Sequence, residues 1–383
     1  MSSETLIPEQ DLLKTPFYDM HVTAGGKMVP FAGYLMPVQY PLGIMKEHVH
    51  TREKAGLFDV SHMGQSYMRS VDGSDPAKVL EEVMPGALAV LKPGKMRYTL
   101  LLNDEGGIED DLMITRTFEP EGSLYVVVNA GCKAKDYAIL EDRFDGRLAL
   151  ELLEDRALLA LQGPKAEAVL AKLAPEVADL NFMEGTMVTL EGVVCWVSRC
   201  GYTGEDGYEI SVPEEEAPAL AARLLLNDDV EWIGLGARDS LRLEVGLCLS
   251  GHDFDASISP VQAGVGFALG KKRREAGDFI GSKRILAELE NGVDKSLVGI
   301  LPTGRAPARE GVEIADADGN VIGKITSGGF GPTHGGPVAM GYVPAAFTAD
   351  GTDVQLLIRG KAHPAKVAKT PFVPQRYKRK KIS

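Results

Sequence analysis

The spacing of hydrophobic residues changes along the chain and predicts a protein that mixes helices and strands. Apolar side chains recur at helical spacing in some segments, and they alternate or run together at strand spacing in others. Helices are expected at residues 43–56, 75–83, 133–144, 163–173, 214–226, 236–244 and 282–291. Strands are expected at residues 57–63, 96–102, 112–117, 124–129, 148–153, 157–161 and 187–197, with short strands and tight turns over 15–45.

From about residue 295 onward the pattern becomes short apolar runs broken by turns. Asp318-Gly319 separates the runs 312–314 and 321–325, which is a strong hairpin signal. The glycine-rich segment 327–332 is expected to be a turn rather than a phosphate loop, because no Gly-Lys-Ser/Thr ending follows it. These features predict a separate small β-barrel or β-sandwich at the end of the chain.

Composition and charge narrow the class of protein. The chain has 383 residues, of which 44% are hydrophobic and 25% charged, which is typical of a soluble globular protein. A formal net charge of -13 argues against a general nucleic-acid binder. No apolar run approaches the ~20 residues of a membrane span. The first residues resemble neither a signal peptide nor a transit peptide, so we expect a cytoplasmic prokaryotic protein or an already matured chain.

The cysteines and histidines give no sign of a metal site. None of the four cysteines forms a Cys-x-x-Cys pair, and reduced, mostly buried thiols are expected. The seven histidines form no ligand pair on one helix face, so no metal is predicted. His62 follows Asp59 closely, and it is either a base beside that carboxylate or a buried, hydrogen-bonded histidine. We favour the structural role.

Five carboxylates crowd into residues 104–111, between two predicted strands. The glycine pair Gly106-Gly107 predicts a hairpin turn there, and an acidic hairpin tip is most often exposed to solvent. Asp110 and Asp111 are adjacent, so in a strand they point to opposite faces and only one faces inward. An inward carboxylate needs a partner or a chemical task. Alternation alone does not say which of the two it is.

A second informative stretch runs from Arg199 to Ser211 and holds three glycines before a strand that contains Glu209. The common structural explanation is a hairpin with an exposed glutamate. The functional explanation is a ligand edge with two neighbouring N–H donors, such as that of a pterin or guanine, which one carboxylate accepts as a pair. Arg238, at the start of a predicted helix, is either a solvated or ion-paired arginine or a fork for a ligand carboxylate. Arg242 is four residues further on and is expected on the same helix face.

Taken together, a series of motifs resembles one family along nearly the whole chain. The motifs lie at residues 15–18, 25–33, 57–63, 106–112, 159–164, 199–210, 236–242, 327–329, 339–343 and 371–374. They resemble the aminomethyltransferases, or T-proteins, of the glycine cleavage system. The resemblance implies an α+β fold with a ring-like arrangement of three domains. It implies a folate-binding region at 1–275 with two interleaved subdomains, the inner one at roughly 55–145, and a C-terminal β-barrel domain at 295–383.

The resemblance also implies a reaction and its partners. The aminomethyl group on the dihydrolipoyl arm of H-protein gives its methylene to tetrahydrofolate, which is the co-substrate. Ammonia leaves and 5,10-methylenetetrahydrofolate forms. No metal, nucleic acid or membrane takes part, and the enzyme is expected in a prokaryotic cytoplasm or, for a matured eukaryotic chain, in the mitochondrial matrix.

Five residues match functional positions of the family. Asp111 falls on the catalytic carboxylate and Glu209 on the glutamate that binds the pterin. Arg238 and Tyr377 match two further folate-contacting positions, and Tyr98 matches a tyrosine near the pterin. Asp104, Glu105 and Asp110 are then expected to be solvated, and the glycine pair is the bend that brings the strand beside the ligand. Glu109 is a departure, since the family often has an apolar residue there, and a charge close to Asp111 would raise the pKa of Asp111.

Two alternatives remain open from the sequence. A folate-dependent demethylase of the same superfamily, acting on a sulfonium or a methylamine, would share the folate residues. A non-catalytic folate-binding protein of the iron–sulfur assembly type would carry a reactive cysteine in a short signature. None of the four cysteines stands in an obvious one.

Overall fold

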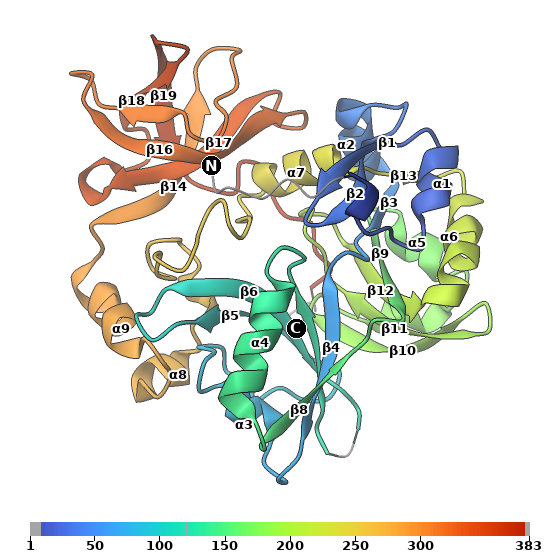
Figure 1. The fold of residues 1–383 in the computed structure, drawn as a ribbon. Helices are drawn as coiled ribbons and strands as arrows, with labels where there is room; N and C mark the ends of the chain where they lie inside the picture. Colours follow the sequence, from blue (N-terminus) through green and yellow to red (C-terminus); the bar gives the residue numbers. More distant parts are fainter. Residues whose placement is uncertain (1–8, 120, 380–383) are drawn as a thin grey trace.

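The computed structural model describes residues 9–119 and 121–379, and three large β-structures lie around a common centre (Figure 1). They are a six-stranded sheet, a five-stranded sheet and a closed barrel. A small two-stranded sheet of β1 (Lys27–Phe31) and β2 (Tyr34–Gln39) stands beside the first of them. The mixed α and β class and the C-terminal barrel expected from the sequence are confirmed.

The six-stranded sheet has the strand order β10-β11-β12-β9-β3-β13 and is antiparallel except for the last pair. Apolar side chains such as Leu159 and Leu161 alternate along β9 and pack against Val169 and Leu220 of the covering helices. The strands are β3 (Ala55–Asp59), β9 (Arg156–Gln162), β10 (Glu184–Leu190), β11 (Val193–Arg199), β12 (Gly207–Pro213) and β13 (Val230–Trp232). The helices around it are α1 (Tyr18–Thr23), α2 (Ile44–Glu53), α5 (Ala166–Leu170), α6 (Ala217–Leu225) and α7 (Leu235–Glu244).

The five-stranded sheet is inserted within the first body. The chain leaves the six-stranded sheet after β3, builds the order β5-β6-β7-β4-β8, and returns at β9. Its strands are β4 (Gly64–Ser70), β5 (Met96–Leu102), β6 (Ile108–Arg116), β7 (Leu124–Val128) and β8 (Leu148–Leu152). Two helices cover one face, α3 (Pro76–Leu80) and α4 (Lys133–Phe144). The Asp75 carboxylate caps α3 by accepting the N–H of Ala77 at 3.0 Å.

The barrel follows two short helices, α8 (Lys271–Ala276) and α9 (Ser282–Asn291). Its six strands close in the order β14-β17-β16-β15-β18-β19. They are β14 (Lys295–Pro302), β15 (Glu313–Ala315), β16 (Val321–Gly331), β17 (Gly336–Pro344), β18 (Asp353–Ile358) and β19 (Lys361–Ala368). Leu243 of α7 packs on Val338 and Met340, so α7 lies between the barrel and the six-stranded sheet (Figure 1).

Three expectations about local structure were wrong. Residues 327–332 are not a turn, because β16 continues to Gly331 and pairs with β17 along that length. The expected strand at 57–63 ends at Asp59. The segment 15–45 contains α1, which was expected to be strand and turn. In the first case the glycines lie where β16 passes close to another backbone, since a Cβ on Gly328 would stand 2.1 Å from the Ala308 carbonyl oxygen.

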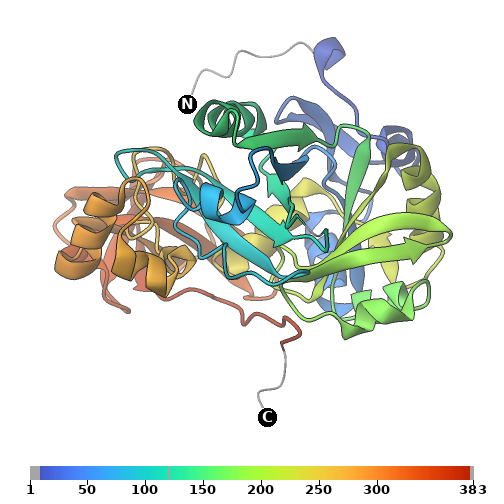
Figure 2. The same cartoon turned by 90° about the horizontal axis from the view of Figure 1, so that it is seen from below.

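The C-terminal segment returns from the barrel to the six-stranded sheet (Figure 2). The N–H of Val373 donates to the Glu244 carbonyl, and the N–H of Phe182 donates to the Lys378 carbonyl. The proposed division into 1–275 and 295–383 stays a prediction, and its ends at 1–8 and 380–383 lie outside the described residues.

Candidate active site

The acidic segment closes the hairpin between β5 and β6, as predicted. Gly106 has φ +76°, a conformation that side chains rarely adopt. A Cβ on Gly107 would stand 1.8 Å from the carbonyl oxygen of Ala256, so the turn presses against a second loop. Asp104 and Glu105 are exposed, as expected. The glycine pair is therefore required by this close approach between two segments of chain.

Asp110 and Asp111 do point to opposite faces of β6, but the expectation that Asp110 is solvated was wrong. Asp110 shares the buried face with Ile108 and Leu112, and its exposed fraction is 0%. Its Oδ1 accepts the Ser250 hydroxyl at 2.6 Å and the Asn129 amide at 3.0 Å. Asp111 lies deep in the protein and yet stays partly accessible, which is the situation of a side chain that faces a cavity.

Asn129 joins the two aspartates, and sequence reasoning missed it. The pairing of Met113 with Val127 places Asn129 opposite Asp111, one residue beyond the end of β7. Its side-chain amide donates to Asp111 Oδ1 at 2.7 Å as well as to Asp110, and its backbone N–H donates to Asp110 Oδ2 at 3.3 Å. Extending the predicted strand pairing from β6 to β7 would have placed Asn129 opposite Asp111.

Burial raises the pKa of Asp111 well above the usual carboxyl range, and the neighbouring Asp110 charge raises it further. The Tyr98 hydroxyl and the Asn129 amide act in the opposite direction. Tyr98 stands across the hairpin, and its ring stacks on Phe267 with 5.5 Å between centroids. Burial and the nearby Asp111 raise the pKa of Tyr98, so its hydroxyl stays protonated and available as a donor.

Glu109 has a partner of its own. Its carboxylate binds the Lys135 ammonium at 2.8 Å and accepts the Asn103 amide at 3.0 Å. Although burial alone would raise it, the Lys135 ion pair and the Asn103 bond leave the pKa of Glu109 below its ordinary value. The Asp111 shift arises mainly from burial and Asp110, so Glu109 does not act on it as the sequence suggested.

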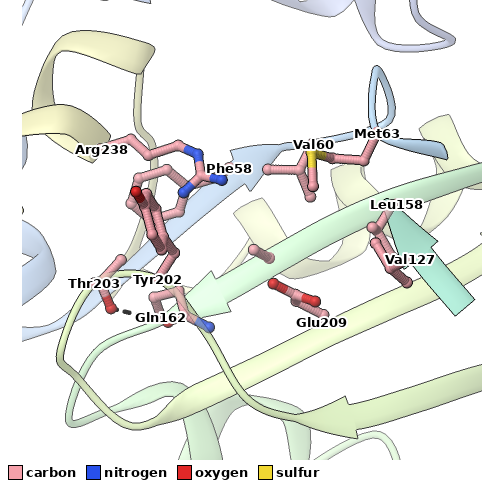
Figure 3. A pocket seen from close by; sticks show the side chains of 11 residues that line it. Phe58, Val60, Met63, Val127, Leu158, Gln162, Tyr202, Thr203, Glu209 and Arg238 are labelled. Atoms are coloured by element: carbon pink, nitrogen blue, oxygen red, sulfur yellow. Dashed lines mark hydrogen bonds between the residues drawn. The ribbon is translucent and has the colours of Figure 1, made fainter. Parts of the chain in front are cut away.

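A pocket opens between the six-stranded sheet, α7 and Val127 of β7 (Figure 3). Apolar side chains make most of its wall, and polar groups enter from two sides. Figure 3 shows the Glu209 carboxylate and the Arg238 guanidinium both directed into it. It is lined by Phe58, Val60, Met63, Val127, Leu158, Ala160, Gln162, Tyr202, Thr203, Glu209 and Arg238.

Glu209 is not an exposed hairpin residue. It lies on β12 between Ser198 of β11 and Ala160 of β9, in the middle of the sheet. Burial raises its pKa, while the adjacent Cys200 thiol and the Arg238 charge lower it. A carboxylate in an apolar pocket with so few donors has unused acceptor capacity. It suits a ligand that brings donors of its own.

Arg238 and Tyr202 form the opposite wall. The guanidinium stacks over the Tyr202 ring with 4.4 Å to the centroid, a cation–π contact. The Tyr202 hydroxyl donates to the Cys248 carbonyl. Burial raises the pKa of Tyr202, the Arg238 charge lowers it and the Asp111 charge raises it, so both charged groups lie near this tyrosine. Glu209, Arg238 and Tyr202 line the pocket, whereas Asp111 and Tyr98 lie outside its wall.

Tyr377 lies at the edge of this site rather than in the pocket wall. Its ring stacks on Phe182 with 3.9 Å between centroids and 9° between planes. The preceding Arg376 donates its N–H to the Gly204 carbonyl at 2.8 Å, which fixes the tail against the glycine-rich segment. Burial raises the pKa of Tyr377 to about 12, and Arg52 lowers it.

The glycines of 199–211 serve the packing of the segment. A Cβ on Gly201 would stand 1.8 Å from Gln162 Oε1, so only glycine fits there. Gln162 holds the turn by donating to the Cys200 carbonyl at 2.9 Å and accepting the Thr203 hydroxyl at 2.9 Å.

A buried ion network ties the pocket to the barrel. Arg52 of α2 donates to the Thr203 carbonyl at 2.6 Å and binds Glu205 at 3.0 Å and Glu244 at 3.1 Å. Glu244 also contacts His48 at 3.0 Å and accepts the backbone N–H of Thr333 at 2.7 Å. These contacts link α2, α7, the glycine-rich segment and the β16–β17 turn.

Arg242 is structural and does not face the pocket. It binds Asp253 at 2.8 Å and donates to the Ser327 hydroxyl at 2.8 Å, with an exposed fraction of 3%. Asp253 in turn holds the loop that carries Ser250, the donor to Asp110.

His62 has no base–carboxylate pairing. The Asp59 carboxylate is instead bound by His21 at 3.0 Å and by the Thr15 hydroxyl at 2.6 Å. His62 is buried, its Nδ1 lacks a hydrogen-bond partner within the described part of the chain, and burial lowers its pKa to about 4. The imidazole is therefore neutral, and the favoured structural role is kept without the expected hydrogen bond.

Comparison with known proteins identifies the family. The family described as "GCVT N-terminal domain" matches residues 17–273, and the "Glycine cleavage T-protein C-terminal barrel domain" matches residues 295–374. The chain belongs to the glycine cleavage T-protein family. The resemblance of the sequence motifs to this family is confirmed.

Individual members of the T-protein family align over nearly their full length. A mitochondrial aminomethyltransferase of Homo sapiens is 46% identical over 96% of this chain and 92% of its own. One of Dictyostelium discoideum is 43% identical over 96% of this chain and 94% of its own. The crystal structure of the glycine cleavage system aminomethyltransferase T from Bartonella henselae superposes with a TM-score of 0.91 at 46% identity, covering 96% of this chain and 100% of that one.

These relatives confirm the three-part T-protein fold and the expected enzyme class, and they do not favour the demethylase alternative. Several of them carry the word mitochondrial in their names, so a prokaryotic cytoplasm is not confirmed. Over residues 9–119 and 121–379, no helix has the length and apolar character needed to cross a membrane. In the same residues no group of three or more potential ligand side chains is placed to hold a metal ion.

Proposed function

We propose that this chain transfers the methylene of the aminomethyl group on the dihydrolipoyl arm of H-protein to tetrahydrofolate, releasing ammonia and forming 5,10-methylenetetrahydrofolate. The observation that carries the proposal is the pocket lined from opposite sides by Glu209 and Arg238, with Asp111 near its Tyr202 wall. This part of the protein combines an apolar pocket, the Glu209 carboxylate with free acceptor capacity, and the nearby Asp111 carboxylate with a raised pKa. A flat heterocycle with a reactive nitrogen at one end suits this combination.

Glu209 is proposed to bind the pterin edge. The ring N–H and the exocyclic amine present two parallel donors, and a carboxylate accepts both at once. The surrounding apolar walls, with Phe58 and Leu158, favour a flat aromatic ligand by burial. Arg238 is held over Tyr202 and has donors left to bind a carbonyl or carboxylate oxygen of the folate.

Asp111 is proposed to act on the reacting carbon. When the aminomethyl group loses sulfur or amine, positive charge develops on an iminium-like carbon, and a carboxylate fixed nearby stabilises it. The same carboxylate orients the folate nitrogen that attacks this carbon. Both roles require the ionised form, which the Asn129 and Tyr98 donors favour against burial and Asp110.

The cysteines are unsuited to nucleophilic catalysis. Burial raises the pKa of Cys132 to about 12, and it also raises the pKa of Cys200 and Cys248. A thiol is nucleophilic mainly as the thiolate, so these groups stay unreactive near neutral pH. We therefore propose direct transfer without a covalent enzyme intermediate, and we set aside the cysteine-bearing iron–sulfur assembly alternative.

Tyr98 and Tyr377 are proposed to flank the folate on two sides. Tyr98 faces Asp111 from β5 and is proposed to lie near the pterin. Tyr377 reaches the edge of the site with the C-terminal tail, where the stacked Phe182 fixes its ring. Its proposed contact is with the part of the folate that leaves the pocket.

Lipoylated H-protein is the proposed partner, and the mitochondrial names of the relatives support a matrix location if the source is eukaryotic. A prokaryotic source would place the enzyme in the cytoplasm.

The proposal is tested by product. Incubating the protein with aminomethylated H-protein and tetrahydrofolate should yield ammonia and 5,10-methylenetetrahydrofolate, and a methyl-sulfonium donor should yield no methylated folate. Transfer of a methyl group from the sulfonium donor, with no transfer from H-protein, would contradict the proposal and favour the demethylase alternative.

A further inference from the structure

A third aspartate lies behind the pair on β6. Asp136, in the first turn of α4, has an exposed fraction of 0%. Neither of its carboxyl oxygens has a hydrogen-bond partner within the described part of the chain. The group that it faces is the Asp110 carboxylate, which is equally buried. Two hydrogen-bond acceptors thus meet in the interior with no donor between them.

Within residues 9–119 and 121–379, no cation forms an ion pair with Asp136 or Asp110. Lys135, the next residue on α4, turns away to bind Glu109 at 2.8 Å and the Glu109 carbonyl at 3.1 Å. The other titratable groups near Asp136 are Asp111 on β6, Cys132 just before α4 and Tyr137 on α4, and none of these brings a positive charge. The N-terminal end of α4 favours a negative charge only weakly compared with the cost of two ionised carboxylates in contact and out of water.

The hydrogen bonds of Asp110 leave room for one more donor. Its two oxygens accept the Ser250 hydroxyl and both the side-chain and backbone N–H of Asn129. A carboxylate has about four lone-pair sites, so one remains unfilled. A proton on Asp136 fills it, and it also gives Asp136 the partner that it lacks.

We propose that Asp136 is a carboxylic acid that donates a hydrogen bond to Asp110, so that these two buried aspartates share one proton. Asp136 is then a positioning residue. It completes the set of donors that fixes Asp110, and Asp110 with Asn129 orients the Asp111 carboxylate. The role of Asp136 in catalysis rests on the proposed function of Asp111, whereas the protonation of Asp136 does not.

The electrostatics agree with this geometry. Burial and the adjacent Asp110 raise the pKa of Asp136 to about 9, whereas Lys135 lowers it only in part. Two carboxyl groups in such contact titrate as a pair and release their last proton well above the ordinary range.

Infrared spectroscopy of the folate-free protein tests the protonation directly. In deuterated buffer near neutral pH, the wild-type protein should show the carbonyl band of a protonated carboxylic acid. Asp136→Asn should lower the intensity of this band by the contribution of one carboxyl group, and Asp111→Asn should retain that contribution. A band of unchanged intensity in Asp136→Asn, or a band absent from both the wild type and Asp111→Asn, would overturn the proposal.

The pH profile of kcat/KM tests the positioning role. Asp136→Asn replaces a neutral donor by another neutral donor. The acid limb of the kcat/KM profile should therefore not move, and kcat/KM should stay within about threefold of the wild-type value. Asp136→Leu removes the donor, and activity should fall by about tenfold or more, because a misplaced reacting group is costly. If Asp136→Asn moved the limb to lower pH, Asp136 would be ionised in the wild type. If Asp111→Asn were fully active while the infrared result held, the catalytic proposal would fail and the shared proton would stand.

Discussion

The side-chain amide of Asn129 donates to Asp111 at 2.7 Å and so holds this carboxylate against the neighbouring Asp110. The two aspartates lie on opposite faces of one strand, and the same amide reaches both because it sits at the end of β7. The arrangement keeps a catalytic candidate ionisable in a place where burial and a like charge oppose ionisation.

Removing the amide should therefore weaken the ionised form of Asp111. In Asn129→Ala the pKa of Asp111 rises further, because a donor is lost while burial and the Asp110 charge remain. The acid limb of the kcat/KM profile should move to higher pH, and kcat should fall by roughly 10- to 100-fold as the carboxylate loses its orientation. The exposed Asn291→Ala serves as control and should behave as wild type. An unmoved limb would show that Asn129 does not act on Asp111.

Asp110→Asn should shift the profile in the opposite direction. It removes the like charge that raises the pKa of Asp111, so ionisation of Asp111 occurs at lower pH and the acid limb follows it. The variant keeps the size of the side chain and the acceptor for Ser250. Steady-state rates measured from about pH 5 to pH 8 with saturating H-protein give the limb. Movement to higher pH would contradict the assignment of Asp110 as an ionised neighbour.

Glu209→Gln should weaken the binding of tetrahydrofolate with little change in fold stability. The amide offers one acceptor where the pterin edge needs two, and it turns an N–H toward a ligand donor. Bonds to a charged group contribute about 1.5–3 kcal/mol, so the dissociation constant should rise by roughly 10- to 100-fold. Calorimetry with tetrahydrofolate measures it, and Glu215→Gln on the exposed surface is the matched control. An unchanged dissociation constant would remove Glu209 from the pterin site.

Glu244→Gln should make the protein less stable and alter its response to acid. The Glu244 carboxylate contacts His48 and Arg52 and accepts two backbone N–H groups from the β16–β17 turn, so its loss leaves a buried arginine partly uncompensated. Breaking a buried pair costs about 3–5 kcal/mol, and the Glu205 partner of Arg52 puts this case near the lower end.

The pH dependence follows from the sign of the shift. The His48, Arg52 and backbone contacts hold the pKa of Glu244 at about 2 against an ordinary value of 4.5. A lowered folded-state pKa stabilises the fold above the ordinary value and is lost as pH falls toward the folded value. Urea unfolding between about pH 5 and pH 2.5 should therefore lose stability more steeply for the wild type than for Glu244→Gln. The exposed Glu313→Gln serves as control and should match the wild type. Equal slopes of unfolding free energy against pH for the wild type and Glu244→Gln would contradict the role of Glu244 in the network.

The sequence predicted much of this fold, because its elements are local patterns. The helices at 133–144 and 282–291 and the strand at 96–102 have the expected bounds. The failure at 327–332 has a physical reason: glycines that permit close backbone contact inside a strand look the same in sequence as glycines that permit a turn.

The site was predictable only in part, for a related reason. Motif resemblance singled out Asp111, Glu209 and Arg238, of which Glu209 and Arg238 line the same pocket. It could not locate Asn129 and Asp136, whose importance depends on the register of β7 and on how α4 packs behind β6. Asp110 was misjudged because burial of a carboxylate is improbable from sequence alone. It becomes reasonable once Ser250, 140 positions away, is seen to donate to it.

Asp111→Asn shows whether the Asp111 carboxylate acts on the reacting carbon. Transfer from aminomethylated H-protein and tetrahydrofolate affinity should be measured on the same preparation, with Asp104→Asn at the exposed hairpin tip as control. Turnover should fall by at least about 100-fold, as for loss of one preorganised charge-stabilising group, while the folate dissociation constant stays near that of the wild type. Wild-type turnover at unchanged folate affinity would contradict this role of Asp111.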